Sequence, residues 1–599
     1  MGYLTSSMVL RGELVLALVA IALALIAIAS ILSGRLARWR TPIAAAGCAM
    51  AGLTPALLFP FLVPTSAEGT ALWEWSAVGG PTIQASYRLD GLGAVGLAIG
   101  ALYGGAALIA TTRVSSRSSL LRPALLLNAF ILMTLAVTND LVAVIVILGA
   151  LAATTIFVAL LVSPAPAVAR VTAYLAAGVQ AFVVAGLLVT RFGGASFRFD
   201  TISPDSVSPG VVLAATIGAA LFAGLYPFVP WGYRHEEAGE RETLRGLLTM
   251  PAGVGAVIVL LRIIGTTRIQ LSELMLPGLI PEQVVVIAGL LFFWSAWRVL
   301  RRQPRARRRF LVSALILGSL LAYPWLHWSH VVLAACILTV AYAAAVSLAL
   351  PDQWPITRYD VALAAAFIGI ATGTPSAVAG SITVLLGGAF AALAEAFWMP
   401  PHRAYVAMLA STTTIVAGAL TIAVGAFDAP DPATVALALV AIVAVVLLEL
   451  VHVGRRLEAA AAPNDLELTA TVFAILSTSL AAILFAAPLL DTLGHAFGRP
   501  LDHGLAAAGY TAAALIVVGA VLAVLAGAVR PMLPATAPIA QRLARVVSFA
   551  DPVPFAASSF RALERSASVA TSVFALFEQR AGVWLAVVLI AGVLVWVVR

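Results

Sequence analysis

The sequence contains no lysine, and charged residues make up only 10% of its 599 residues. Soluble domains carry roughly 25% charged residues, whereas 62% of this chain is apolar. The composition therefore excludes a soluble protein and predicts an integral membrane protein. All 35 basic residues are arginines, and a buried arginine keeps its proton where a buried lysine can lose it. Chemistry that needs a buried lysine to release a proton is excluded as well.

Cofactor-binding and metal-binding motifs are also missing from the sequence. The two cysteines, Cys48 and Cys336, are far apart, so the chain has no cysteine cluster for an iron–sulfur or zinc site. No phosphate-binding glycine loop, dinucleotide-binding glycine motif or His-Glu-x-x-His zinc motif occurs. We therefore expect no catalytic residue, no metal and no cofactor in this chain. The net charge of +8 reports membrane orientation rather than a nucleic-acid partner.

Apolar runs recur along the whole chain, and each is long enough to cross the ~30 Å hydrocarbon core as a helix. We predict an all-α polytopic membrane protein with about 16 to 18 transmembrane helices, some of them broken. Arginines concentrate in alternate loops, which places both termini outside and the basic loop Arg298–Arg309 inside. This loop is predicted to be a topology anchor.

One stretch, Ile217–Ile263, joins two apolar runs through a short charged loop. Pro227 and Trp231 stand at the end of the first run, and Arg262 stands near the end of the second. Proline inside an apolar span interrupts a helix, which membrane proteins tolerate where the break is buried or lines a cavity. The layout resembles the seventh and eighth helices of the antiporter-like subunits of respiratory complex I, Mrp-type antiporters and membrane-bound hydrogenases.

Further motifs follow in the order of the same family. Asp90, within Leu-Asp-Gly-Leu, resembles the start of the family's third helix, and Asp140, within Asn-Asp-Leu, resembles the start of the fifth. Gly373 and Pro375 resemble a Gly-x-Pro break. Carboxylates at helix starts cap free N–H groups, so we expect both aspartates to be structural. Arg262 is expected to contact backbone carbonyls or lipid headgroups.

The resemblance also implies that a proton relay has been lost. The family pairs a glutamate of the fifth helix with a lysine of the seventh. The corresponding positions here are Gly149 and Phe222. Neither can ionise, so the resemblance implies an antiporter-like subunit with a structural or coupling role.

A few ionisable residues remain inside or beside the predicted spans. The candidates for an ion pathway are Glu395, Glu449, His452, His235, Glu236 and Glu237. An intramembrane carboxylate is a functional hypothesis by default. The alternative is that Glu395 and Glu449 lie near the membrane edge and pair with nearby arginines, namely Arg403, Arg455 or Arg456. His327 and His330 flank an aromatic cluster and are expected to anchor the chain at the outer boundary.

The chain is predicted to have five regions. These are N-terminal spans (1–85), an antiporter-like core (86–400), C-terminal spans (401–530), a lateral arm (531–581) and a last transmembrane anchor (582–599). The arm includes an amphipathic helix over Ala556–Arg580 with a Phe-rich face, which is typical of a helix lying at the membrane surface. The complex I family has a lateral helix and a final span in the same place.

Three functions fit this sequence. The first is an antiporter-like subunit of a complex I, Mrp or hydrogenase type assembly in the prokaryotic plasma membrane, with other membrane subunits and lipid as its partners. As such it would belong to a proton-translocating oxidoreductase without being catalytic alone. The second is an active proton or cation transporter with a rerouted relay. The third is the membrane partner of an inorganic-carbon uptake system.

Overall fold

The computed structural model describes residues 18, 20–32, 36, 39–58, 70–76, 82–88, 91–113, 120–162, 165–191, 196–203, 206–225, 240–266, 327–349, 354–396 and 401–459. All of these residues belong to one compact unit, Met1–Gln541. The predicted lateral arm, the last anchor and the spans between 267 and 326 lie outside the described residues.

The described chain is built almost entirely of apolar helices. An apolar helix over Ala20–Ile31 comes first. The helices that follow are α2 (Arg40–Leu58), α3 (Gly91–Arg113), α4 (Leu121–Val137), α5 (Leu141–Val162), α6 (Ala165–Arg191), α7 (Pro209–Ala223), α8 (Glu240–Thr266), α11 (Trp328–Ala349), α12 (Trp354–Thr372), α13 (Pro375–Ala396), α14 (Pro401–Ala426) and α15 (Pro432–Ala459). The spans that the apolar runs predict in this part of the chain overlap these helices, and they lie near 42–63, 91–112, 119–138, 141–163, 168–190, 209–231, 246–267, 330–350, 359–376, 379–398, 404–426 and 433–453. The run near 209–231 extends beyond the end of α7 at Ala223.

Helix ends are set by local chemistry. Helix α7 begins with Pro209, whose fixed φ suits a first helical turn, and ends at Gly224, which adopts the left-handed φ of 66°. Gly373 has a φ of 76° and separates α12 from α13, which begins at Pro375. A left-handed residue followed by proline ends one helix and starts the next. The chain therefore reverses direction between α12 and α13 within two residues.

A short β-hairpin departs from the all-helical pattern. Strand β1 (Thr70–Ser76) pairs antiparallel with β2 (Thr82–Tyr87), and the register shifts between Ala71 and Trp73. Alternating polar and aromatic or β-branched residues in these segments favour strands. The sequence analysis assigned only membrane spans to residues 1–85, so the hairpin was missed because it is too short and too polar to resemble a span.

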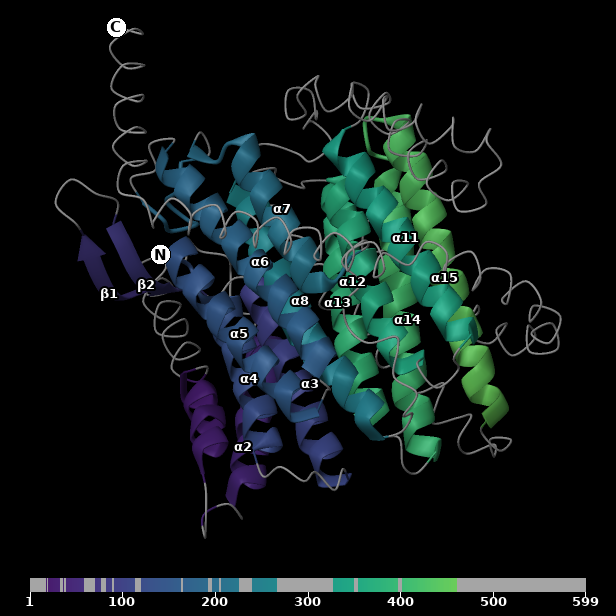
Figure 1. Ribbon diagram of the computed structural model, residues 1–599, viewed down its shortest axis with the longest axis horizontal. Helices are drawn as coiled ribbons and strands as arrows, with labels where there is room; N and C mark the ends of the chain where they lie inside the picture. Colours follow the sequence, from purple (N-terminus) through teal and green to yellow (C-terminus); the bar gives the residue numbers. More distant parts are fainter. Residues whose placement is uncertain are drawn as a thin grey trace, which may run out of the picture. The chain divides into compact units, whose positions relative to one another are not determined.

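The helices form two neighbouring groups, α2–α8 and α11–α15 (Figure 1). Helix α3 packs against α13, and α8 packs against α12, which joins the groups. Helices α13 and α14 pack closely, since a Cβ added at Gly418 would come within 2.6 Å of Val384 Cγ2 and 2.8 Å of the Gly380 carbonyl oxygen. Small residues allow such close approach of helices in membranes.

Four of the described helices contain a segment long and apolar enough to cross a membrane. These segments are Leu141–Val162, Val171–Arg191, Pro375–Ala392 and Pro432–Leu450. Shorter apolar helices accompany them. The prediction of an all-α polytopic membrane protein is confirmed, with the hairpin as an addition.

Candidate functional site

A buried ion pair joins α12 to α15. The Arg358 Nη2 atom lies 3.0 Å from Glu449 Oε2, and its Nε lies 3.3 Å from Oε1. The same Nη2 donates to Ser411 Oγ at 2.8 Å and to Thr412 Oγ1 at 2.9 Å. Thr412 Oγ1 in turn donates to Glu449 Oε2 at 3.3 Å. Three helices, α12, α14 and α15, therefore meet at one polar cluster, which we call the Arg358–Glu449 cluster.

The two charged side chains of this cluster are buried. The side chains of Arg358 and Glu449 are 2% and 0% exposed. A buried charge pair is tolerated only when its geometry is good and hydrogen bonds satisfy the remaining donors and acceptors. Here the two contacts between Arg358 and Glu449 supply the geometry, and the hydroxyls of Ser411 and Thr412 supply the hydrogen bonds. Because arginine does not release its proton, the pair can hold charge in place but cannot pass a proton through Arg358.

The partner of Glu449 differs from the prediction. The sequence analysis paired it with Arg403, Arg455 or Arg456, which are close in sequence or at helix ends. Its ionic partner in the structure is Arg358, 91 residues away. That pairing was one alternative, which placed Glu449 near the membrane edge. The structure differs because α12 packs directly on α15 and buries the Glu449 side chain completely.

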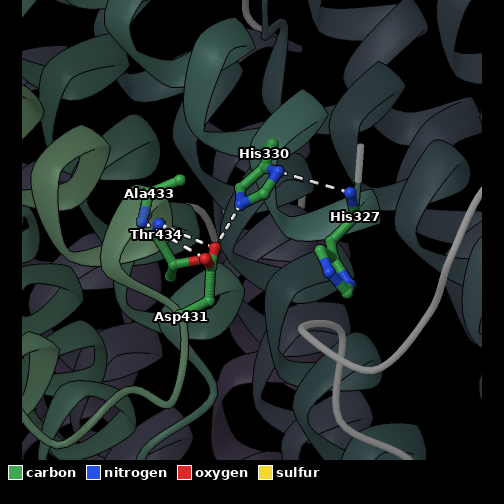
Figure 2. A network of polar contacts seen from close by, with 5 residues as sticks. All are labelled: His327, His330, Asp431, Ala433 and Thr434. Carbon is green, nitrogen blue, oxygen red and sulfur yellow. Dashed lines mark hydrogen bonds and ion pairs between the residues drawn. The ribbon is translucent and has the colours of Figure 1, made fainter. Parts of the chain in front are cut away.

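A second polar cluster ties α11 to the start of α15 (Figure 2). The His330 Nε2 atom lies 2.5 Å from Asp431 Oδ2. His330 Nδ1 accepts the His327 backbone N–H at 3.3 Å, so in a neutral ring the proton resides on Nε2 and faces Asp431. Asp431 also accepts the N–H groups of Ala433 at 3.3 Å and Thr434 at 3.0 Å, which caps α15.

These contacts favour the ionised form of Asp431. Partial burial raises the pKa of its carboxyl, but the hydrogen bonds from His330, from the Thr434 hydroxyl and from two backbone N–H groups outweigh it and lower the pKa to about 2. The carboxylate is therefore charged at any physiological pH. It fixes the end of α15 against α11, which is an anchoring role.

The position that the sequence resemblance aligns with the family's lysine is filled by packing. Phe222 in α7 is 1% exposed and meets Phe182 of α6 edge to face, with the ring centroids 6.2 Å apart. A Cβ added at Gly178 would lie 2.5 Å from Phe222 Cδ2. The ring therefore occupies a groove that α6 opens for it, and no space remains there for a solvated ammonium group.

The position that the sequence resemblance aligns with the family's glutamate lies on the outer face of its helix. Gly149 in α5 is partly exposed, and an added Cβ would meet no atom within 4 Å. The buried face of α5 consists of Leu141, Val144, Leu148, Leu151, Ala152, Thr155, Val158 and Ala159. None of these side chains ionises near neutral pH. The inward face of α5 thus offers no carboxylate, whichever residue is aligned with the family glutamate.

Other family-matching residues have structural contacts. Asp140 is fully buried, and its Oδ1 accepts the Ala143 N–H at 2.9 Å at the start of α5. Arg262, 5% exposed, donates from Nη2 to the Ala136 carbonyl at 2.5 Å. Gly373 forms the left-handed break before α13.

Several predicted residues cannot be placed. Glu395 and His452 lie in α13 and α15, but their side chains fall outside the described part of the structure, as do Asp90, Pro227, Trp231, His235, Glu236 and Glu237. Among the residues that are described, no group of three or more His, Cys, Asp or Glu side chains could hold a metal.

Sequence reasoning missed Arg358, Ser411, Thr412 and Asp431. Two signals were present: an arginine next to Tyr and Asp at the start of an apolar run, and four consecutive hydroxyl residues, 411–414, inside another. Hydroxyl side chains in a transmembrane helix often bond across to a neighbour.

Comparisons with known proteins agree with this architecture. No protein-family model and no curated protein match the chain. Among solved structures, a chain of the Mrp complex from Dietzia sp. DQ12-45-1b is similar, with a TM-score of 0.57 and 18% identity over 92% of this chain and 60% of that one. This chain thus spans about 60% of the length of the Mrp chain.

Two other complexes contain similar chains. One is the archaeal membrane-bound sulfane sulfur reductase, with a TM-score of 0.51 and 14% identity over 84% of this chain and 99% of that chain. Another is respiratory complex I from Thermus thermophilus, with a TM-score of 0.49, 16% identity and the same coverage. At these identities the similarity to the Mrp and sulfane sulfur reductase chains shows a shared fold. The predicted resemblance to the subunits of such membrane complexes is confirmed at the level of the fold.

Proposed function

We propose that this chain is an antiporter-like subunit of a multisubunit membrane assembly of the Mrp or complex I type, in which it has a structural or coupling role. The observation that carries the proposal is the filling of the relay position by Phe222, packed against Phe182 and Gly178. The inward face of α5 supports it, because that face carries no ionisable group. Partners would be other membrane subunits and lipid of a prokaryotic plasma membrane.

The described buried residues of the two helices that follow in the family pattern, α7 and α8, also offer no proton carrier. The described buried residues of α7 contain none, and in α8 the ionisable one is Arg262, which donates to a backbone carbonyl. An arginine holds its proton throughout a transport cycle. A transporter built on this bundle would need a path around it.

A rerouted relay through Glu449 is the second candidate function. Glu449 is fully buried and accepts a hydrogen bond from the Thr412 hydroxyl, as a proton-carrying carboxylate would. The bidentate contact to Arg358 argues against it, because both carboxylate oxygens of Glu449 are engaged by a side chain that does not release its proton. The two functions make opposite predictions for one assay.

The assay measures proton flux in liposomes that contain purified protein, an internal pH dye and an imposed sodium or potassium gradient. We expect wild-type vesicles to match protein-free vesicles. The variants are Glu449→Gln and Glu395→Gln, and Asp428→Asn serves as the control because Asp428 is exposed in the loop before α15. Wild-type flux that disappears in Glu449→Gln or Glu395→Gln but persists in Asp428→Asn would establish the rerouted relay and overturn the proposal.

A further inference from the structure

Helix α8 contains a proline in the middle of the bundle. Pro251 has no N–H, so the carbonyl of Leu247, one turn earlier, lacks its helical hydrogen-bond partner. Membrane helices tolerate such a break where neighbouring helices, hydroxyl side chains or ordered waters satisfy the freed carbonyl. The side chains that surround Pro251 therefore decide how this break is satisfied.

Three buried polar side chains lie in the surrounding helices without a hydrogen-bond partner. Within the described residues, no partner is found for Tyr103 Oη in α3, both amide atoms of Asn128 in α4 or Thr155 Oγ1 in α5. Their side chains are 2%, 1% and 0% exposed, respectively. The threonine is unusual, because Thr134 and Thr216 return their hydroxyls to the carbonyl four residues earlier. The Thr155 hydroxyl does not.

Helices α4, α5 and α8 lie side by side beside Gly255, at one level of the bundle, meaning one height along the helix axes. A Cβ added at Gly255 would lie 2.9 Å from Leu151 Cδ2 and 3.5 Å from Leu132 Cδ1, which fixes a common level. Arg262 of α8 reaches the carbonyl of Ala136 in α4. Higher residue numbers therefore lie in the same direction in both helices, so α4 and α8 run parallel. The short 138–140 connection makes α5 antiparallel to α4.

A step of four residues, about 6 Å along each helix, leads from that level to the polar residues. Four residues back along α4 lies Asn128, four forward along α5 lies Thr155, and four back along α8 lies Pro251. Asn128 shares a helix face with Leu132, and Thr155 shares one with Leu151, since residues four apart are neighbours on a helix. Both side chains therefore face α8 near its proline.

Helix α3 arrives at the same level independently. A Cβ added at Gly96 would lie 3.2 Å from Ile258 Cδ1 of α8. Seven residues onward in α3 is Tyr103, and seven residues back in α8 is Pro251. Helix α3 runs antiparallel to α4 and hence to α8. Tyr103 and Pro251 therefore lie in the same direction from the contact between Gly96 and Ile258, at about the same level. Three neighbouring helices thus each present one unpartnered polar side chain beside the break in α8.

We propose that bound water molecules occupy this level and bridge Tyr103, Asn128 and Thr155 to the freed carbonyl of Leu247. The ligand class follows from the chemistry of the groups. An amide, two hydroxyls and a carbonyl supply both donors and acceptors, which is what water requires. Hard cations are held by oxygen ligands, with carboxylates prominent among them, and no carboxylate lies among these four groups.

The water site goes beyond the proposed function and does not contradict it. Toward the Arg262 end, the next level is made of Leu132, Leu135, Leu151 and Gly255. These side chains offer no hydrogen bond, so the water does not continue across the bundle in that direction. The site hydrates one level of the core and stabilises the proline break.

The decisive experiment is a high-resolution electron cryomicroscopy map of the wild-type protein in its membrane complex. We expect density within hydrogen-bond distance of Asn128 and Thr155, and its absence from the Asn128→Leu/Thr155→Val double variant. A wild-type map that resolves ordered water elsewhere in the core but leaves this level empty overturns the proposal. Density that strengthens when sodium in the buffer is replaced by rubidium also overturns it, because the ligand would then be a cation.

A stability measurement gives a second test that needs no map. Thr155→Val keeps the shape of the side chain, and Thr154→Val is the matched control because the Thr154 hydroxyl bonds to its own helix at 3.0 Å. Loss of a water partner should lower the unfolding midpoint of Thr155→Val below that of Thr154→Val. A midpoint higher than wild type would show that the Thr155 hydroxyl is buried dry, and would overturn the water site.

Discussion

Removing one member of the Arg358–Glu449 pair should destabilise the protein far more than removing both. The single variants are Arg358→Leu and Glu449→Leu, and the third is the double variant. Each single change removes the ionic partner of a charge that is buried among α12, α14 and α15. The double variant leaves two leucines beside the hydroxyls of Ser411 and Thr412, where no charge needs a partner.

The structure gives the size of the effect. At the 3.0 Å contact between Nη2 and Oε2, the attraction between unit charges is about 5 kcal/mol at an effective dielectric constant of ~20. Desolvation of two ions costs several kcal/mol and offsets most of it. Each single variant loses the attraction but keeps one desolvated ion, so we expect a loss of about 3–5 kcal/mol. The double variant should recover most of that loss.

Unfolding can be followed by circular dichroism while a mild detergent is exchanged stepwise for sodium dodecyl sulfate. Thr412→Val removes one hydroxyl that contacts both ions and should cost about 1–2 kcal/mol. Asp428→Asn, an exposed carboxylate, should stay within about 0.5 kcal/mol of wild type. Both of these variants should therefore lose less stability than Arg358→Leu or Glu449→Leu.

Additive losses of stability in the double variant would contradict this role of the ion pair. If the double variant is destabilised by the sum of the two single losses, the side chains act independently and the ion pair is not what holds the three helices. Single losses below about 1 kcal/mol would have the same meaning, since a pair reached by solvent contributes little.

The remaining predictions concern other parts of the chain. Gly178→Ala should destabilise the protein by about 1–3 kcal/mol through its clash with Phe222, and Phe222→Leu in the same chain should relieve the clash; an unchanged unfolding midpoint in Gly178→Ala would contradict the packing. The pKa of Asp431 is lowered from 3.8 to about 2, so its stabilisation is present above pH ~4 and lost as the pH falls through ~2. Because that side chain is 28% exposed, Asp431→Asn should cost only about 1 kcal/mol at neutral pH; a cost that does not shrink on acidification would argue against the ion. Deleting Ala556–Arg580 with the last span rejoined should release the subunit from its complex but not from the membrane, as co-purification would show; an intact complex would exclude a docking arm.

Local sequence determined most of the fold. Apolar runs of about 20 residues must form helices in a membrane, because the backbone has no other hydrogen-bond partner there, and the predicted spans match the described helices. The Asp140 cap depends on residues three apart, which a sequence pattern can show. The absence of lysine and the apolar character of Phe222 are also properties of the sequence alone.

Tertiary packing decided which polar groups meet. Arg358 and Glu449 are 91 residues apart, and His330 and Asp431 are 101 apart. Nothing local selects these pairs, because many helices of similar composition compete and only the packing of α12 and α11 on α15 brings the partners together. Each polar residue could be read from the sequence, but its partner could not, since one turn of shift between two helices moves a side chain by about 5 Å and replaces every contact it makes.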